Sequence, residues 1–197
     1  WFIDSEIFGP MDEKNCSASL DRMESLINGL EDIKNEFNLH EKGTFKIDVI
    51  NSRVDAVYRA APRHRKETPE ERQQRCRNNR LRIEIYKRLR AFGITKVYLG
   101  LESGSDSQLK RFGKGVSVSE NKIAVMLLRA LGFEVEIGFI FFDQLATIQE
   151  LRDNVDFLES LGFDRNGDRV LGSLRVQAGS PMVRMLKHER LLGKLHV

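Results

Sequence analysis

The stretch ITKVYLGLESGSDSQLKRFGK, residues 94–114, decides the fold. It predicts a buried strand that ends in a polar elbow containing glycine and then enters a helix. Strand side chains alternate between two faces, so the two leucines and Val97 share one face while Gly100 and Glu102 share the other. A glycine inside a strand is typical of a close approach by a ligand, which here would lie near Glu102. The alternative is a packing glycine, with Glu102 capping the next helix.

The composition is that of one globular domain. The chain has 197 residues, of which 41% are hydrophobic and 31% are charged, and this is enough for a full-sized core. We therefore expect residues 1–197 to form a single domain. The net charge of +3 does not by itself predict nucleic-acid binding. Residues 59–90, however, hold 12 Lys and Arg against four Glu, and this basic segment could contact a nucleic acid.

The two cysteines, Cys16 and Cys76, lie far apart without metal-ligand spacing. They predict neither a zinc site nor a disulfide framework, and they favour a reducing, cytoplasmic setting. The sequence shows no apolar run of membrane-spanning length and no signal peptide, so we expect no membrane partner.

The chain opens on Trp1, inside a predicted strand, and we expect a truncated or processed product. The unpaired edge of that strand predicts self-association.

Strand-like and helix-like segments alternate along the chain. Strands are expected at 1–4, 45–50, within 94–114, and at 135–142 and 170–177, and helices are expected between them. Thr68 and Thr147, each with Glu three residues later, predict helix starts. The helix after Ser119 has an apolar stripe that predicts its buried face: Ile123, Met126, Leu127 and Leu131. Residues 60–79 form a basic inserted connection.

Five strand–helix repeats predict an α/β fold with a parallel sheet. An open doubly wound sheet and a partial barrel both fit this order. No GxxxxGK[ST] or GxGxxG turn follows a strand. We therefore favour a partial (β/α)6 TIM-like barrel with five βα units present.

Functional groups of barrels lie where strands end. The predicted strand ends carry a mixed polar rim suited to a nucleoside that bears an amino acid: Asp4, Ser5, Glu6, Asn51, Ser52, Arg53, Glu102, Ser103, Ile140, Asp143, Gln177 and Ala178. The four histidines lie outside these ends, so neither hydrolytic nucleophile chemistry nor a histidine metal site is predicted. No catalytic residue is assigned.

The motifs, taken in order, resemble a known family. They are WFIDSE, NSRVD, VYLGLESGSDSQLKRFGKG, VEIGFIFFD followed by Thr147 and Glu150, and LRVQAGSP. This series is similar to the radical S-adenosylmethionine (SAM) superfamily, in particular to the branch whose members often carry a cobalamin-binding domain. Phe142, Gln144, Ala146 and Ala178 depart from the residues common in that branch.

The resemblance implies units two to six of a six-unit barrel. The family's first unit carries a CxxxCxxC loop that binds a 4Fe-4S cluster, and neither cysteine of this chain matches it. The implied function is part of an enzyme that cleaves SAM reductively and modifies an unknown substrate through a radical. The implied cofactors are SAM, a 4Fe-4S cluster held by other residues, and cobalamin. This fragment alone should be inactive.

The resemblance also implies a SAM-binding wall. Glu102 would meet the ribose hydroxyls and Lys114 the SAM carboxylate. Ile140 would lie under the adenine. The remaining candidates would hold the methionyl amino group (Asp4, Ser5 and Glu6), close the pocket (Ser52 and Arg53) or pair with the adenine edge through the backbone (Val176 and Gln177).

Other interpretations remain open. Arg53 could form only a local ion pair with Asp55, Lys114 could be a solvated turn residue, and the basic helix could be a solvated face. The chain could instead be a non-catalytic module that binds SAM or a partner. It could also belong to an RNA-modifying enzyme that holds its substrate with residues 59–90, and such binding would weaken steeply with salt.

Overall fold

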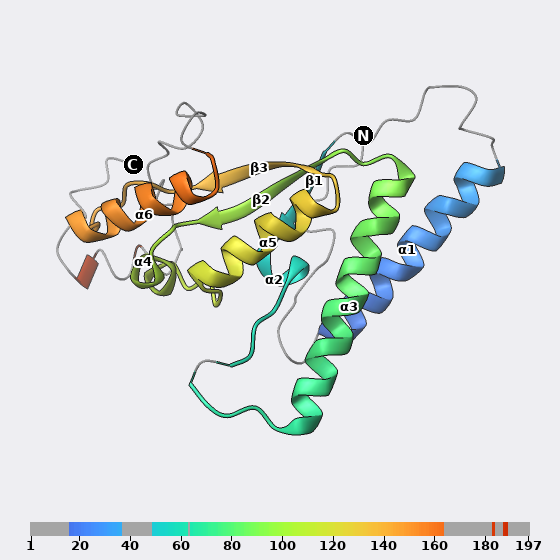
Figure 1. Ribbon diagram of the computed structural model, residues 1–197, viewed down its shortest axis with the longest axis horizontal. Helices are drawn as coiled ribbons and strands as arrows, with labels where there is room; N and C mark the ends of the chain where they lie inside the picture. The colour runs from blue at the N-terminus through green and yellow to red at the C-terminus, as the bar shows by residue number, and fades with distance from the viewer. Residues whose placement is uncertain (1–15, 37–48, 63, 164–182, 184–186, 189–197) are drawn as a thin grey trace. The chain divides into compact units, whose positions relative to one another are not determined.

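A computed structural model describes residues 16–36, 49–62, 64–163, 183 and 187–188. Helices and strands alternate through these residues (Figure 1). The elements are α1 (Cys16–Glu36), β1 (Val49–Arg53), α2 (Val54–Val57), α3 (Pro69–Phe92), β2 (Lys96–Glu102), α4 (Asp106–Arg111), α5 (Val118–Ala130), β3 (Glu134–Phe139) and α6 (Ile148–Ser160). The α/β class predicted from the sequence is confirmed.

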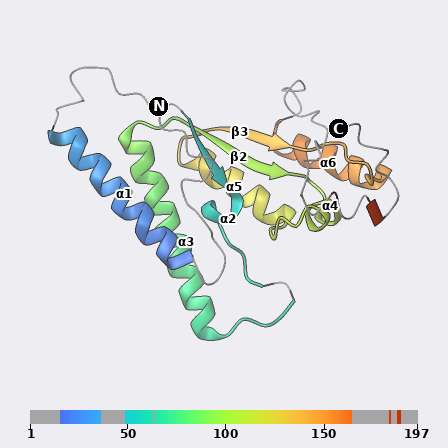
Figure 2. The same cartoon turned by 180° about the vertical axis from the view of Figure 1, so that it is seen from behind.

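The three described strands form one parallel sheet in the order β1-β2-β3 (Figure 2). In β1 and β2, Ser52 is level with Leu99 and Arg53 with Gly100. Burial alternates along β2 as predicted: Val97, Leu99 and Leu101 are fully buried, and the residues between them are exposed or half-buried. The side of β2 that carries Gly100 and Glu102 is therefore the more open one.

The helix starts predicted from capping residues are confirmed. Thr68 accepts a hydrogen bond from the amide of Glu71, and the Glu71 side chain accepts one from the amide of Thr68. Thr147 and Glu150 form the same capping box at α6. Two backbone donors are satisfied at each helix start, which fixes where the chain enters the helix.

One strand boundary and one helix face differ from the prediction. The strand predicted at 45–50 is expected to end before Asn51, whereas β1 runs to Arg53 and α2 follows at once. Residues 69–79 of the basic connection form the first turns of α3, in line with the helix start predicted at Thr68.

The apolar stripe predicted for the helix after Ser119 is wrong. That helix, α5, begins at Val118, its buried face contains Ala124, Val125 and Leu128, and Met126 is exposed. Apolar residues surround most of this helix, so spacing alone does not select the face that packs.

The chain divides into two compact units. The first unit contains residues 1–101 and 119–137, and the second contains residues 102–118 and 138–197. In the first unit, α1 packs along α3 (Figures 1 and 2) through a buried stripe that includes Leu20, Met23 and Ile27. The second unit contains Glu102 and the two segments that follow β2 and β3. The single-domain assignment stays a prediction.

Two predicted strands, 1–4 and 170–177, lie outside the described residues. The edge expected at Trp1 lies there too. None of the helices in the described ranges combines the length and apolar character needed to cross a membrane.

Candidate functional site

Glu102 ends β2 in a left-handed backbone conformation. Its φ is 66°, and it is the one non-glycine residue with positive φ in the described part of the chain. This conformation strains any residue with a Cβ, and such strain is concentrated at functional sites. A glycine would relieve the strain, so a carboxylate at this strained position is a candidate functional group.

The Glu102 carboxylate forms an ion pair with Lys114. Lys114 Nζ lies 2.7 Å from Glu102 Oε1, and the two side chains are 38% and 20% exposed. Lys114 stands between Gly113 and Gly115, both with positive φ. Both charged groups are therefore open enough to water to meet a ligand.

Ile140 lies beside Glu102. Its amide donates a hydrogen bond of 2.8 Å to the Glu102 carbonyl, and its side chain is half-buried. The second unit thus brings together three of the predicted site residues, namely Glu102, Lys114 and Ile140.

The elbow after Glu102 is held by α6. Asn154 Oδ1 accepts hydrogen bonds from the Gly104 amide at 2.7 Å and from Ser103 Oγ at 2.9 Å. Asn154 Nδ2 donates to Gln108 Oε1 at 3.0 Å. Ser103, Gln108 and Asn154 are all fully buried. A buried polar network with its partners in place makes the elbow rigid.

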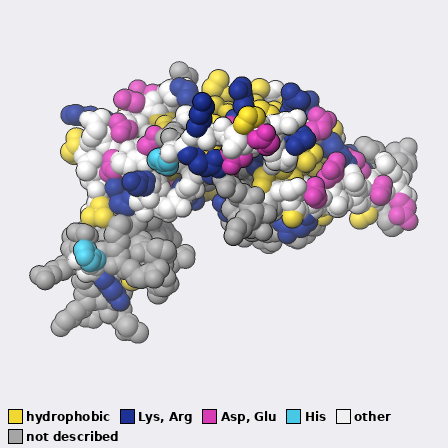
Figure 3. All heavy atoms as spheres, turned by 90° about the horizontal axis from the view of Figure 1, so that it is seen from below, with side chains coloured by type: hydrophobic (Ala, Val, Ile, Leu, Met, Phe, Trp, Pro, Cys, Tyr) yellow, Lys and Arg dark blue, Asp and Glu magenta, His cyan; other side chains and the backbone are white. Residues whose placement is uncertain are grey.

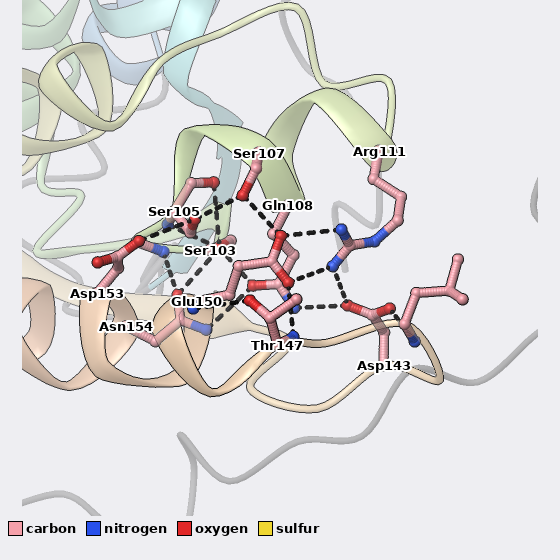
Figure 4. Close-up of polar contacts among 12 residues, drawn as sticks. Ser103, Ser105, Ser107, Gln108, Arg111, Asp143, Thr147, Glu150, Asp153 and Asn154 are labelled. Carbon is pink, nitrogen blue, oxygen red and sulfur yellow. Dashed lines mark hydrogen bonds and ion pairs between the residues drawn. The ribbon is translucent and has the colours of Figure 1, made fainter.

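A half-buried guanidinium links the elbow to the segment after β3. Figure 4 shows Arg111 pointing between Asp143 and Glu150. It donates to Glu150 at 2.9 Å through both terminal nitrogens and to Asp143 at 2.8 Å. The side chains of Asp143 and Glu150 are 1% and 5% exposed. A hydrogen bond from the Arg111 guanidinium lowers the pKa of Glu150 to about 2, although burial by itself would raise that pKa. Hydrogen bonds from the Ser107 hydroxyl and the Thr147 amide lower it further.

Gly104 leaves no room for a side chain. A Cβ built there would lie 2.4 Å from Phe157 Cβ and 3.1 Å from the Asp153 carbonyl. Gly104→Ala should therefore destabilise the protein by about 1–3 kcal/mol through overpacking. Urea unfolding of the full-length protein measures this change.

The matched control is Gly29→Ala in α1, where a Cβ meets nothing within 4 Å. Alanine suits a helix interior, so this variant should gain about 0.5–1 kcal/mol. Equal stabilities of the two alanine variants would contradict the close packing at Gly104.

The two predicted site residues of the first unit, Ser52 and Arg53, lie on opposite faces of β1. Ser52 lies on the side of β1 that carries the buried Ile50, and its hydroxyl contacts the hydroxyl of Tyr86 on α3. Arg53 is level with Gly100 and is exposed, and it forms a two-pronged ion pair with Asp55 at 2.9 and 3.0 Å. The local ion pair expected as an alternative for Arg53 is present. Ser52 faces α3 instead of sharing the face of Arg53.

Five predicted residues lie outside the described residues. They are Asp4, Ser5, Glu6, Val176 and Gln177.

Comparisons with known proteins agree on one group of enzymes. No family model matches. The curated relative 4'-phospho-dehydrooxetanocin synthase of Priestia megaterium is 39% identical over 109 residues, which are 55% of this chain and 13% of the relative.

Solved structures of one enzyme are also similar. The apo, selenomethionine-labelled form of the cobalamin-dependent SAM radical enzyme OxsB matches 96% of this chain with a TM-score of 0.66 and 26% identity. The form with aqua-cobalamin and SAM bound matches 95% with a TM-score of 0.58 and 28% identity. The chain is thus similar to part of a cobalamin-dependent radical SAM enzyme. It spans 13% of the curated relative and 22 to 28% of the OxsB chains.

The cysteines of this chain do not fit an iron–sulfur cluster. Cys16 is buried at the start of α1, where Arg82 Nη2 donates to its sulfur at 2.9 Å, and Cys76 is exposed on α3. No group of three or more His, Cys, Asp and Glu suited to a metal occurs in the described ranges.

Several cations of the basic segment are paired with neighbouring acids. Arg65 pairs with Glu71, and Arg75 pairs with Glu67. Arg88 pairs with Glu31 of α1. Figure 3 shows Lys and Arg beside Asp and Glu on the described surface. These pairs reduce the positive charge available to a phosphate backbone.

Sequence reasoning missed Gln108, Arg111 and Asn154. The sequence does contain a clue to Arg111. It ends the helix that follows one predicted strand, and from there an arginine can reach carboxylates in the loop after the next strand. The partners of Asn154 lie about fifty positions earlier in the chain, and a single sequence does not show them.

Proposed function

We propose that this chain supplies the SAM-binding wall of a radical SAM catalytic domain. The observation that carries the proposal is the carboxylate of Glu102, placed at a strained strand end beside a cation and a half-buried isoleucine. Its two oxygens suit the two adjacent hydroxyls of a ribose. The Lys114 ammonium suits the carboxylate of SAM.

The remaining predicted residues complete the proposed pocket. Asp4, Ser5 and Glu6 would hold the methionyl ammonium, and Ile140 would pack under the adenine. The backbones of Val176 and Gln177 would pair with the adenine edge. Arg53 stays a predicted contact, and its ion pair with Asp55 would hold its guanidinium in place, whereas Ser52 faces Tyr86 of α3 and is not part of the proposal.

The finer fold belongs to the same proposal. Three parallel strands are described, and the strands predicted at 1–4 and 170–177 would extend them to five βα units of a partial (β/α)6 barrel. Strand ends of such a barrel lie on one rim, which suits a single bound nucleoside.

In the whole protein we propose reductive cleavage of SAM to a 5'-deoxyadenosyl radical that modifies a substrate. A 4Fe-4S cluster held by residues outside this chain would supply the electron, and cobalamin would serve as a further cofactor, as the OxsB likeness suggests. This chain's share is to bind and orient SAM and to exclude water, because the cofactors carry the difficult chemistry.

Lys114→Met in the full-length protein tests the role of the ammonium. We expect SAM to bind about tenfold more weakly, because a charge-assisted contact to the carboxylate is lost. Isothermal titration with SAM and with decarboxylated SAM measures the effect. Decarboxylated SAM lacks the carboxylate, so its affinity should change little.

Lys114→Arg is the control, because it keeps the charge and should keep most of the affinity for SAM. Equal losses for the two ligands, or no loss for SAM, would contradict the proposed contact.

A further inference from the structure

Asn154 is a buried amide of α6 whose polar atoms all face the elbow that follows β2. It is 0% exposed. Its oxygen accepts from the Gly104 amide at 2.7 Å, and its nitrogen donates to Gln108 at 3.0 Å. Its hydrogen bonds within the described residues reach Ser103, Gly104 and Gln108 but not the Glu102 side chain, so any effect on that carboxylate passes through the backbone.

The backbone that Asn154 holds begins two residues after Glu102. The Ile140 amide also donates to the Glu102 carbonyl. Two hydrogen bonds therefore hold the backbone directly after the strained φ of Glu102, which is 66°. Strained conformations persist only where the surroundings over-determine them, and the Gly104 amide bond is one of these constraints.

Loss of the Asn154 amide would release that constraint. The Gly104 amide would be buried without an acceptor, a costly state that a shift of the elbow relieves. The elbow packs closely on α6, since a Cβ at Gly104 would meet Phe157, so it has room to move only away from that helix. Such a shift lets Glu102 relax and moves its carboxylate.

We infer that Asn154 is a positioning residue for SAM binding, which acts by fixing Glu102 in its left-handed conformation. The inference rests on the proposed function, because Glu102 must contact SAM for its position to matter. Small displacements of a binding group have large effects on its interaction, and we expect Asn154→Ala to weaken SAM binding about tenfold.

A double-mutant cycle tests the inference. SAM dissociation constants are measured by isothermal titration for the full-length protein, reconstituted with its cofactors, as wild type, Glu102→Ala, Asn154→Ala and the double variant. If Asn154 acts through Glu102, the double variant should bind no more weakly than Glu102→Ala alone. A merely structural role predicts losses that multiply.

Three results separate the two claims. Weaker SAM binding in both single variants, with the double variant no weaker than Glu102→Ala, supports the inference. Loss in Glu102→Ala, with either no loss in Asn154→Ala or losses that multiply, overturns the inference and leaves the proposed function standing. No loss in Glu102→Ala overturns both.

Two further variants guard against a folding defect. If Asn154→Ala does not fold, Asn154→Ser replaces it in the double-mutant cycle. The shorter serine side chain also removes the oxygen that accepts from the Gly104 amide. Leu20→Ala, in the buried face of α1, destabilises the protein without touching the elbow. Its folded fraction should bind SAM as wild type does, and an equal loss there would assign the Asn154 effect to stability and overturn the inference.

Discussion

Glu102→Ala should weaken SAM binding by the full-length protein about 100-fold, because two charge-assisted hydrogen bonds to the ribose are lost, each worth about 1.5–3 kcal/mol before compensation. The proposed 4Fe-4S cluster is held by residues outside this chain, so cluster content should stay at the wild-type level. Isothermal titration gives the affinity, and iron analysis checks the cluster.

Glu134→Ala provides the matched control. Glu134 is also a strand glutamate paired with a lysine, since Lys96 Nζ lies 3.0 Å from it. It stands at the start of β3, at the opposite end of the strand from the proposed site, so its loss should leave SAM affinity unchanged. If the two variants bound SAM equally well, the assignment of Glu102 would be wrong.

Arg111→Ala should destabilise the protein by about 3–5 kcal/mol, because it leaves the buried carboxylates of Asp143 and Glu150 without their cation. Urea unfolding at pH 7 measures the loss. Arg65→Ala is the control, because it removes an arginine from a two-pronged pair with Glu71 that lies at the surface. The surface pair is screened by water and should contribute far less.

The acid side of the stability profile checks the same cluster. The pKa of Glu150 falls from 4.5 to about 2 in the folded protein. A depressed carboxyl pKa adds stability above the unfolded value, and this contribution is lost as the pH falls from about 4.5 toward 2. Without Arg111 the pKa of Glu150 should rise, so the variant should lose less stability over that interval. An unchanged acid profile in Arg111→Ala would contradict the proposed pairing.

The sequence predicted those features that depend on local patterns. Alternation in β2 correctly placed Val97 and Leu101 in the core and Glu102 on the open face, because strand geometry alone sets that period. The capping boxes at Thr68 and Thr147 were visible because their partners lie three residues away. The prediction of the buried face of α5 was wrong, because apolar residues at both Ala124 and Met126 permit two apolar stripes.

Site residues could be predicted only where their place on or after a strand fixes the face or the edge of the sheet at which they lie. Glu102 and Ile140 could be placed near each other because both follow parallel strands. Ser52 and Arg53 were expected together, but consecutive strand residues point to opposite faces, and the strand continues through both. The support from Asn154 required knowing that α6 packs on the elbow, which is tertiary information.

The most direct measurement is a crystal structure of the full-length protein with SAM bound. We expect the Glu102 carboxylate within about 2.6–3.2 Å of the ribose hydroxyls, with Lys114 turned from Glu102 toward the SAM carboxylate. SAM bound elsewhere, with Glu102 still paired only to Lys114, would contradict the account.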